Sequence, residues 1–315
     1  MKRIIIIIPY FGPFPMQFKF WLQSAYDNPT VDFLLITDQV LVSRDNVKVV
    51  SMTFSELKTF IQAKFNFLLS IKSPYKLCDF KPAYGYIFQQ YINDYDFWGF
   101  GDVDLVYGSI RSFYTDEILS KYKLISGFGH LTLYENSDFC KNFYKTDCSG
   151  FQFYRDSFSN PNNTVFDEYI HGGMSDLWKH LYPNSIYDQR SFDDILVPRL
   201  SFNFISVFNS KVSNNLIFEY LDGNLFRIFL NENHEIIREP TLYAHFQQRK
   251  FMKVKTGNLD HYLIIPNSFI DFSKVTNQLL NKYGKSQNLR RILWNFLNRL
   301  NRRLNIILPF LFYKK

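Results

Sequence analysis

Two carboxylates stand one residue apart at Asp102-Val103-Asp104, directly after the aromatic run at 97–101. Because a single apolar residue separates them, both can face one divalent cation where the chain turns out of a strand. Carboxylate oxygens suit Mg²⁺ or Mn²⁺, which complete their coordination with water and substrate phosphates. The alternative is a pair of solvated turn aspartates, since such a triplet often arises by chance.

A second chemically active stretch, HFQQRK, follows much later at 245–250. His245 offers a ring nitrogen to a metal, and Lys250 offers a positive charge to a diphosphate. The alternative is a hydrogen-bonded histidine beside a solvated basic turn. Taken together, the two stretches predict a site for a metal ion and a diphosphate.

Three further residues are able to position or deprotonate a hydroxyl group. Asp167 and Glu168 are adjacent acids beside Phe166, and His130 lies in the stretch GHLTLY. Consecutive side chains face different ways in regular structure. We therefore expect at most one of the two acids to act and the other to be solvated.

Alternating strands and helices are predicted to position these residues. Apolar runs at 4–8, 31–36, 47–50 and 97–101 predict buried strands. Apolar residues at helical spacing predict a helix over 18–25, and Thr53 with Glu56 forms a capping-box signature before another. The carboxyl ends of strands are where α/β proteins bind ligands, so the acids after residue 101 lie where a site is expected.

Pro82 predicts a helix over 83–91 that begins just after Asp79 and Lys81, which places these polar residues at a helix mouth. For Asp79 the alternative is a plain helix N-cap. From residue 123 onward, short strands are predicted at 131–134, 201–207 and 225–230, around a polar region at 157–164. We expect this half to recognise a second substrate.

Charge and cysteine content exclude several classes of protein. The 315 residues carry a net charge of +7, but eight basic residues and no acid lie in 285–315, so the rest of the chain carries −1. A nearly neutral body argues against binding to nucleic acid. Three cysteines without metal-binding spacing fit a reducing cytoplasm. The apolar run at 4–8 ends at Pro9, too early for a signal peptide.

The C-terminal segment has a different character. Apolar residues recur at three- and four-residue steps over 289–304, with arginines mostly between them, which predicts a basic amphipathic helix. We expect this tail, 271–315, to bind an anionic membrane surface, whereas the alternative is packing on the body or on a second copy. No apolar run approaches the roughly 18 residues of a spanning helix.

Several stretches together resemble bacterial glycosyltransferases of the GT-A fold, of the type encoded in polysaccharide loci. They span about 1–255 and read IIIIIPYFGPFP, LLITD, YKLCDFKPAYGYIF, DFWGFGDVDLVYGSIR, GHLTLY and YAHFQQRKF. The resemblance implies an α/β fold with a Rossmann-like mixed central sheet flanked by helices, followed here by the amphipathic helix. It implies a catalytic domain over 1–270, with a nucleotide-sugar half to about 125 and an acceptor half over 126–270.

The resemblance also implies roles for single residues. Pro9, Tyr10 and Asp38 correspond to the lining of a nucleotide base pocket, with Tyr10 stacked on uracil. Asp79 and Lys81 resemble an SDxxR element that binds nucleoside and donor sugar, with Lys where Arg is commoner. Asp102 and Asp104 would bind the metal, and Asp102 also the donor.

His245 and Lys250 resemble the metal ligand and diphosphate-binding lysine of an HxxGxxKPW motif. Here its Gly, Pro and Trp are missing, and the spacing is one residue shorter. The late His and Lys and the DFK helix are similar to those of retaining enzymes, although Asp167 or Glu168 would serve an inverting enzyme as base.

The sequence thus predicts a glycosyltransferase that moves sugar from a UDP-sugar to a surface-glycan acceptor on a lipid carrier. It would use Mn²⁺ or Mg²⁺ and work in the cytoplasm, peripherally at the inner face of the cell membrane. One alternative is a nucleotidyltransferase, although only Gly12 is present where a glycine-rich phosphate loop would be needed. The other is a non-catalytic glycan-binding module at the membrane.

Overall fold

The computed structural model describes residues 1–195, 206, 215–247 and 252–284, and it divides the chain into two compact units. The division falls between Phe192 and Asp193, whereas the sequence suggested one body to about residue 270. The predicted strand at 201–207, apart from Ser206, lies outside the described residues. So do Lys250 and the predicted helix at 289–304.

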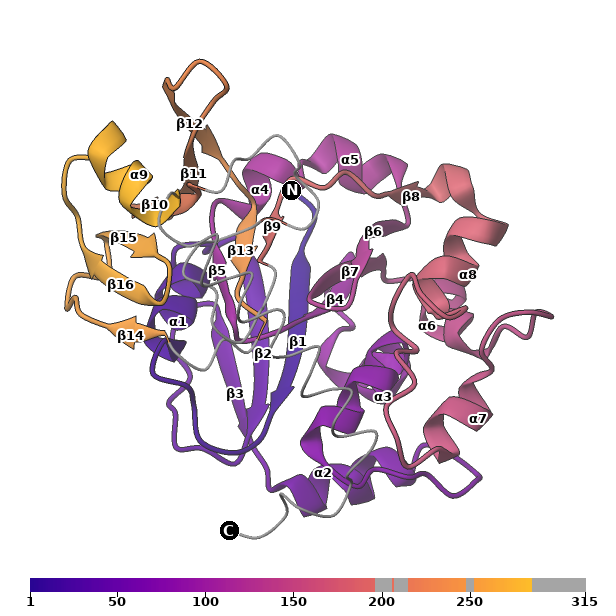
Figure 1. Cartoon of the computed structure of the whole chain (residues 1–315). Coiled ribbons are helices and arrows are strands. Elements are labelled where there is room, and N and C mark those ends of the chain that lie inside the picture. The colour runs from indigo at the N-terminus through magenta and orange to yellow at the C-terminus, as the bar shows by residue number, and fades with distance from the viewer. Residues whose placement is uncertain (196–205, 207–214, 248–251, 285–315) are drawn as a thin grey trace, which may run out of the picture. The chain divides into compact units, whose positions relative to one another are not determined.

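Within the described part of the first unit, seven strands form one mixed sheet (Figure 1) in the order β3-β2-β1-β4-β7-β6-β8. Their bounds are β1 (Ile4–Tyr10), β2 (Val31–Thr37), β3 (Val47–Ser51), β4 (Phe97–Gly101), β6 (Leu124–Phe128), β7 (Leu131–Glu135) and β8 (Ile186–Tyr187). Strands β1 to β4 pair in parallel, and β7 runs antiparallel to β4 and β6. The strands β6, β7 and β8 therefore continue the sheet of β1 to β4.

The central strand β1 shows why the sheet forms here. All five isoleucines from Ile4 to Ile8 are at most 2% exposed, as expected for a parallel strand covered on both faces. Successive side chains alternate between the two faces. Ile5 and Ile7 join the large hydrophobic core on one side, and the even-numbered isoleucines point to the other.

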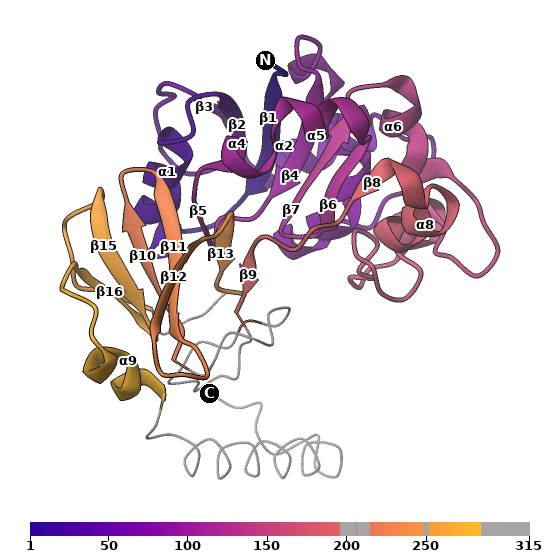
Figure 2. The ribbon, with the colours of Figure 1, turned by 90° about the horizontal axis from the view of Figure 1, so that it is seen from above.

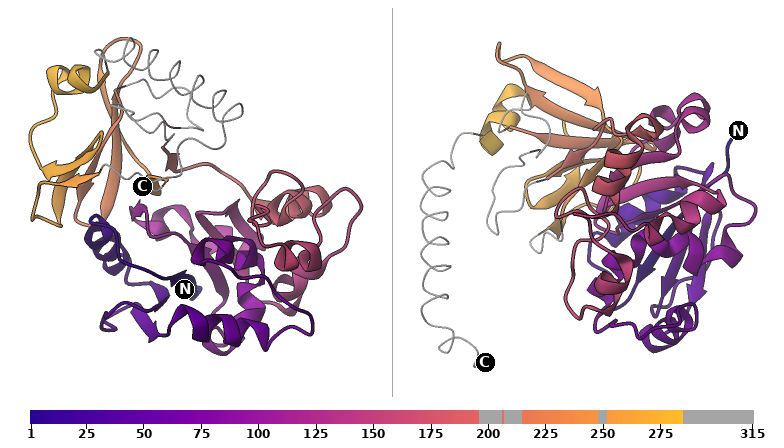
Figure 3. Two further views of the ribbon diagram at one scale, coloured as in Figure 1. Left: turned by 60° about the horizontal axis from the view of Figure 1, so that its bottom comes forward. Right: turned by 90° about the vertical axis from the view of Figure 1, so that its right-hand side faces the viewer.

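Helices cover both faces of the sheet. They are α1 (Phe18–Tyr26), α2 (Phe54–Gln62), α3 (Tyr84–Ile87), α4 (Ile110–Phe113), α5 (Asp116–Lys121), α6 (Asp138–Asn142), α7 (Tyr154–Ser159) and α8 (Met174–Leu181). On one face, α2, α3, α6, α7 and α8 supply the core around Ile7; α6 to α8, drawn in crimson tones, cluster together in Figure 3. On the other face, Trp21 of α1 meets Phe33 edge-on at 6.0 Å. The α/β class expected from the sequence is confirmed.

Short 3₁₀ segments and one small strand complete this unit. They are η1 (Pro74–Ala83), η2 (Gln89–Tyr91), η3 (Phe143–Lys145), η4 (Pro183–Ser185) and β5 (Leu105–Tyr107). The capping box of Thr53 and Glu56 is confirmed at the start of α2. The predicted helix over 83–91 is wrong in its extent, since Asp79 and Lys81 lie inside the 3₁₀ helix η1 and α3 is one short turn.

In the described part of the second unit, six strands form a sheet in the order β12-β11-β10-β15-β16-β14 (Figure 2). They are β10 (Ile217–Leu221), β11 (Asn224–Leu230), β12 (Ile236–Pro240), β14 (Lys253–Val254), β15 (His261–Ile265) and β16 (Ser268–Asp271). Leu280 of α9 (Asn277–Gly284) packs against Ile217 and Ile228 of this sheet. Two further short strands, β9 (Asp193–Asp194) and β13 (Tyr243–His245), pair in parallel with each other. Along the chain, β9 precedes β10, and β13 lies between β12 and β14.

Among the residues described, no helix combines the length and the apolar character needed to cross a membrane.

Candidate active site

Three parallel strands end at one edge of the first unit's sheet. Strands β2 and β4 flank β1 on opposite sides and run parallel to it (Figure 1). Tyr10 ends β1, Asp38 follows β2 and Asp102 follows β4, so all three share this edge. The chain moves from β1 to β2 in one direction and returns to the other side of β1 with β4. Such a reversal of strand order leaves a crevice at the strand ends, where α/β sheets bind ligands.

The 3₁₀ helix η1 brings polar side chains towards this edge. It has three residues per turn, so side chains three apart lie in one row. The rows are Tyr75, Cys78 and Lys81; Lys76 and Asp79; and Leu77, Phe80 and Ala83. The third row joins the hydrophobic core. The other two rows carry separate sets of polar contacts, described next.

Lys76 and Asp79 form a buried ion pair, with the two side chains 2% and 0% exposed. The Nζ of Lys76 also donates to the main-chain oxygens of Ser157 and Asn162, at 2.8 and 2.7 Å. A buried ion pair offsets the cost of desolvation only when additional hydrogen bonds satisfy it. This pair meets that condition by holding the segment after α7.

Asp79 holds the same segment further along. Its carboxylate accepts hydrogen bonds from the main-chain amides of Thr164, at 2.9 Å, and Phe166, at 3.0 Å. Both oxygens of the Asp79 carboxylate therefore accept hydrogen bonds from the chain segment that leads to Asp167. Asp79 is not a helix N-cap, and this geometry gives it a positioning role where the sequence suggested contact with a nucleoside.

Lys81 is the cation at the centre of the site. Its Nζ donates to Asp102 Oδ1 at 2.8 Å and to the main-chain oxygen of Gly129 at 2.7 Å, and lies 3.8 Å from Asp167 Oδ2. Burial by itself lowers the pKa of Lys81, but Asp102, Cys78 and Asp167 together raise it well above its ordinary value. Lys81 therefore stays charged and joins the end of β4 to the acid pair.

Asp167 and Glu168 lie together above Gly129. A Cβ placed on Gly129 would stand 2.3 Å from Glu168 Oε1 and 2.7 Å from Asp167 Oδ2. The expectation that consecutive acids diverge is wrong here, because they follow a turn in which Val165 has a φ of +56°. Burial, with Glu168 and Asp102 adding to it and Lys81 opposing it, raises the pKa of Asp167 to about 8.

His130 directly follows Gly129, the residue over which the acid pair lies. Its ring stacks on Phe128 at 5.5 Å and meets Phe192 edge-on at 5.1 Å. Its main-chain oxygen accepts from the Asp102 amide at 3.2 Å. His130 thus belongs to the hairpin that holds Asp102 in place.

The ends of β1 and β2 form the other side of the site. Tyr10 donates to the main-chain oxygen of Pro13 at 3.0 Å, and its ring stacks on Phe14. Burial raises the pKa of Tyr10, and the nearby carboxylates of Asp104 and Asp38 raise it further. An aromatic ring therefore stands near both carboxylates, beside the partly buried Pro9 of β1.

Negative charge exceeds positive charge in this part of the first unit. Lys81 faces Asp102 and Asp167, and Glu168 and Asp104 add two further carboxylates around them. Asp102 and Asp104 are both partly exposed, on either side of the buried Val103. Oxygen donors with surplus negative charge have the chemistry that a hard divalent cation requires.

His245 lies in the second unit, where Asp194 orients its ring. Its Nδ1 bonds Asp194 Oδ1 at 2.8 Å, and Gln247 donates to the same oxygen at 2.6 Å. A carboxylate on one ring nitrogen orients the ring and directs the other nitrogen to a metal. Asp194 was not singled out from the sequence, since nothing local in SFDD distinguishes it.

The sequence analysis also missed Tyr75 and Gly129. Tyr75 is 60% exposed, yet it shares a row of η1 with Lys81, and its pKa is raised by burial and then by Cys78 and Asp167. It therefore stands at the outer end of the site. Its three-residue spacing from Cys78 and Lys81 was visible, but became meaningful only with a 3₁₀ helix.

Comparisons with known proteins place the chain as follows. The profile of a family of unknown function (DUF6625) matches residues 6–273. No curated protein is similar to the chain in sequence.

Among solved structures, the galactosyltransferase LgtC in complex with donor and acceptor sugar analogues is similar at 9% identity and a TM-score of 0.37, over 77% of this chain and 87% of that one. The glycosyltransferase GlyE of Streptococcus pneumoniae TIGR4 is similar at 8% identity and a TM-score of 0.30, over 59% and 44%. Scores below 0.5 do not establish a shared fold.

Gly129→Ala is expected to displace the acid pair, because the added Cβ would collide with both carboxylates. The backbone at Gly129 is not in the left-handed region, so the effect is one of space alone. We expect a fall in turnover of at least tenfold with a small loss of thermal stability. Gly150→Ala has open space around it but a positive φ, so it serves as a control for backbone strain. Unchanged turnover in Gly129→Ala would contradict a role of the acid pair in this site.

Asp167 should make the protein less stable as pH rises. The folded protein keeps a proton on Asp167 up to about pH 8, whereas the ordinary pKa is 3.8. The folded state therefore binds more protons between these values, and the free energy of unfolding falls with rising pH. Asp167→Asn should remove this part of the pH dependence in denaturant titrations at pH 5 and pH 8 with chelator present. A wild-type-to-variant difference that is the same at both pH values would refute the raised pKa.

Proposed function

The chain belongs to the family of unknown function DUF6625, and we propose that it is a GT-A type glycosyltransferase that uses a nucleotide diphosphate sugar and a divalent metal. The observation that carries the proposal is the buried Lys81 between Asp102 and Asp167 at the strand-order reversal. This arrangement joins the DxD strand end to a second pair of acids. In sugar transfer, the DxD acids would face the donor diphosphate, and the second pair of acids would face the acceptor hydroxyl on the other side of the reacting carbon.

The nucleotide is proposed to bind at the ends of β1 and β2. Tyr10 and Phe14 stack at 5.4 Å, and Phe14 stacks in turn on Phe18, which gives a base an aromatic surface. Asp38 is exposed beside it, and its pKa is lowered by hydrogen bonds from Gln39 and Gly12, so it stays ionised. With Pro9, these residues support the uridine pocket that the sequence resemblance implies.

Asp102, Asp104 and His245 are proposed to hold Mn²⁺ or Mg²⁺. Their donor chemistry fits: two partly exposed carboxylates, and an imidazole whose Nδ1 is already bound to Asp194. Lys81 donates to Oδ1 of Asp102, and the carboxylate has further lone pairs for a metal. When bound, the metal would neutralise the departing diphosphate. Lys250 is proposed from the sequence alone to add charge there.

The acceptor hydroxyl is proposed to meet Glu168. Asp167 carries a proton at neutral pH, since its pKa is raised to about 8, and is therefore a hydrogen-bond donor. Glu168, partly exposed beside it, is proposed to position the hydroxyl. His130 supports the site through its hairpin. Retention of configuration is proposed from the resemblance to retaining enzymes.

The acceptor is proposed to be a surface glycan on a lipid carrier. The supporting observation is in the sequence, where 285–315 holds eight basic residues and no acid. Such a segment is attracted to an anionic membrane surface. This would place the enzyme peripherally at the inner face of the cell membrane.

Asp104→Asn should abolish transfer, because it replaces a charged metal ligand by a neutral one at a partly exposed position. The assay is release of UDP from UDP-sugars with Mn²⁺ and a panel of glycan acceptors, and we expect a loss of at least a hundredfold. Asp94→Asn, at an exposed acid outside the site, is the matched control. Sugar transfer by Asp104→Asn at nearly the wild-type rate would contradict the proposed function.

Tyr10→Ala should weaken UDP binding through loss of ring stacking, by about 1 kcal/mol or roughly fivefold in affinity. Tyr10→Phe keeps the ring and should bind nearly as well as wild type. Calorimetry with Mn²⁺ should also rank UDP above GDP and ADP. Equal affinity for the three nucleotides would remove the uridine assignment and leave the transferase assignment standing.

A further inference from the structure

Strand β6 departs from regular pairing just before the hairpin that reaches Gly129. Its register against β7 shifts between Ile125 and Phe128, and the two residues between them, Ser126 and Gly127, have φ angles of +76° and +79°. Such a bulge bends a strand and redirects the side chains that follow it. Ser126 is 1% exposed and carries a Cβ, so this conformation persists only where the surrounding contacts hold it.

Tyr169, in the turn at 165–169, supplies one of these contacts. Its hydroxyl donates to the main-chain oxygen of Ser126 at 2.9 Å, and its ring meets Phe128 edge-on at 5.0 Å. The approach is close, since a Cβ placed on Gly127 would stand 2.3 Å from the Tyr169 hydroxyl oxygen. Burial raises the pKa of Tyr169, so the hydroxyl keeps its proton and remains a donor.

Three consecutive side chains therefore lie on one short stretch of the hairpin. Asp167 and Glu168 lie over Gly129, and Tyr169 lies over Gly127, two residues earlier. Glycine at both positions leaves the room that these side chains occupy. The bond made by Tyr169 and the placement of the two acids thus belong to one contact between the turn and the hairpin.

The opposite side of the turn is held through its main chain. The main-chain oxygen of Asp167 accepts from the Ser175 hydroxyl at 3.0 Å. A Cβ placed on Gly173 would stand 2.4 Å from the main-chain oxygen of Glu168. These contacts fix the backbone of the turn at the start of α8. The Tyr169 hydroxyl holds the same segment on the hairpin side, where both carboxylates lie.

We propose that Tyr169 is a positioning residue of the site: its bond to Ser126 keeps the two carboxylates over Gly129. The proposal rests on the proposed function and concerns its acceptor side, where Glu168 would position the acceptor hydroxyl. In this role Tyr169 acts through the acids and touches neither substrate nor metal. Without the hydroxyl, the ring still packs on Phe128, but the turn is able to move away from the hairpin.

The first test needs no turnover and is a double-mutant cycle in the free energy of unfolding of the full chain. Gly129→Ala presses on the carboxylates, and in the wild type the Tyr169 hydroxyl keeps the turn from moving away. In the Tyr169→Phe background the turn can yield. We therefore expect the factor by which Gly129→Ala lowers the folding equilibrium constant to be at least threefold smaller there than in the wild type.

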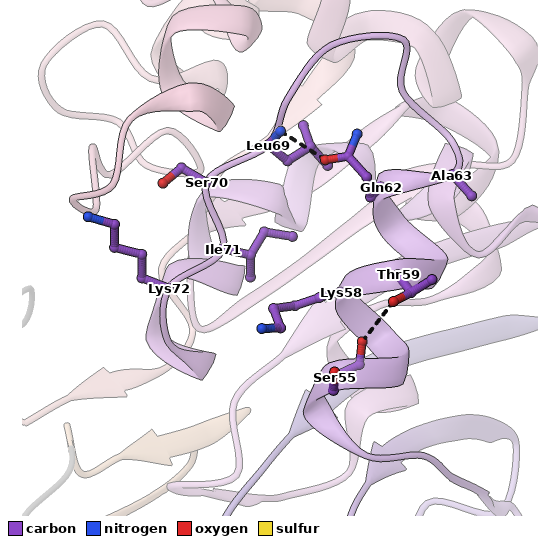
Figure 4. A pocket seen from close by; sticks show the side chains of 9 residues that line it. All are labelled: Ser55, Lys58, Thr59, Gln62, Ala63, Leu69, Ser70, Ile71 and Lys72. Atoms are coloured by element: carbon purple, nitrogen blue, oxygen red, sulfur yellow. Dashed lines mark hydrogen bonds between the residues drawn. The ribbon is translucent and has the colours of Figure 1, made fainter.

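Tyr86→Phe is the matched control for the loss of one hydroxyl. Tyr86 also donates to a main-chain oxygen, that of Lys64, at 3.0 Å. Lys64 follows Ala63, which Figure 4 shows at the end of α2, and no residue that lines the groove there belongs to the proposed site. Gly129→Ala should have the same effect in Tyr86→Phe as in the wild type. The same effect in Tyr169→Phe as well would overturn the proposal.

The second test is kinetic and follows UDP release with Mn²⁺ and a glycan acceptor. Tyr169→Phe should lower kcat at least fivefold and leave the KM for the UDP-sugar unchanged, whereas Tyr86→Phe should change neither. An unchanged kcat in Tyr169→Phe would overturn the proposal even if the cycle shows coupling. Absence of transfer by the wild type would contradict the proposed function, and the cycle would then decide by itself whether Tyr169 holds the acids in place.

Discussion

A buried ammonium group needs partners, and the site depends on how Lys81 finds them. Its contacts reach the end of β4 through Asp102, the β6–β7 hairpin through Gly129 and the acid turn through Asp167. These segments lie more than 20 residues apart along the chain. Because leaving a buried charge unpaired costs several kcal/mol, the three segments must meet wherever Lys81 is placed. One side chain thereby fixes the positions of these three segments relative to one another.

The 3₁₀ helix η1 explains how Lys81 comes to be buried at that point. Ten residues is long for a 3₁₀ helix, which normally runs for three or four. Its repeat of three residues per turn gives three rows of side chains with different contacts. One row packs in the core, one holds the segment after α7, and one faces the site. An α-helix would spread the same residues around its circumference and break the rows. The helix type therefore decides which side chains of this segment share a row.

The same helix gives the acids their different properties. Asp79 is paired with Lys76 and accepts hydrogen bonds from two main-chain amides, so its contacts are structural. Asp167 shares one lysine with Asp102 and lies near Glu168, and burial raises its pKa to about 8. Glu168 and Asp104 remain partly exposed. Identical functional groups thus differ in hydrogen bonding, pKa and exposure through burial and neighbours alone.

Local signals in the sequence determined the strands at 4–8, 31–36 and 97–101, the capping box of Thr53 and Glu56, and the acids after the strand end. Each of these depends on neighbours within a few residues. The tertiary structure alone decided that Asp79 bonds the amides at 164 and 166, that both Asp167 and Glu168 lie over Gly129, and that Tyr75 stands in line with Lys81. These contacts join residues 38 to 87 positions apart or depend on a helix type that periodicity does not specify, so no local pattern encodes them.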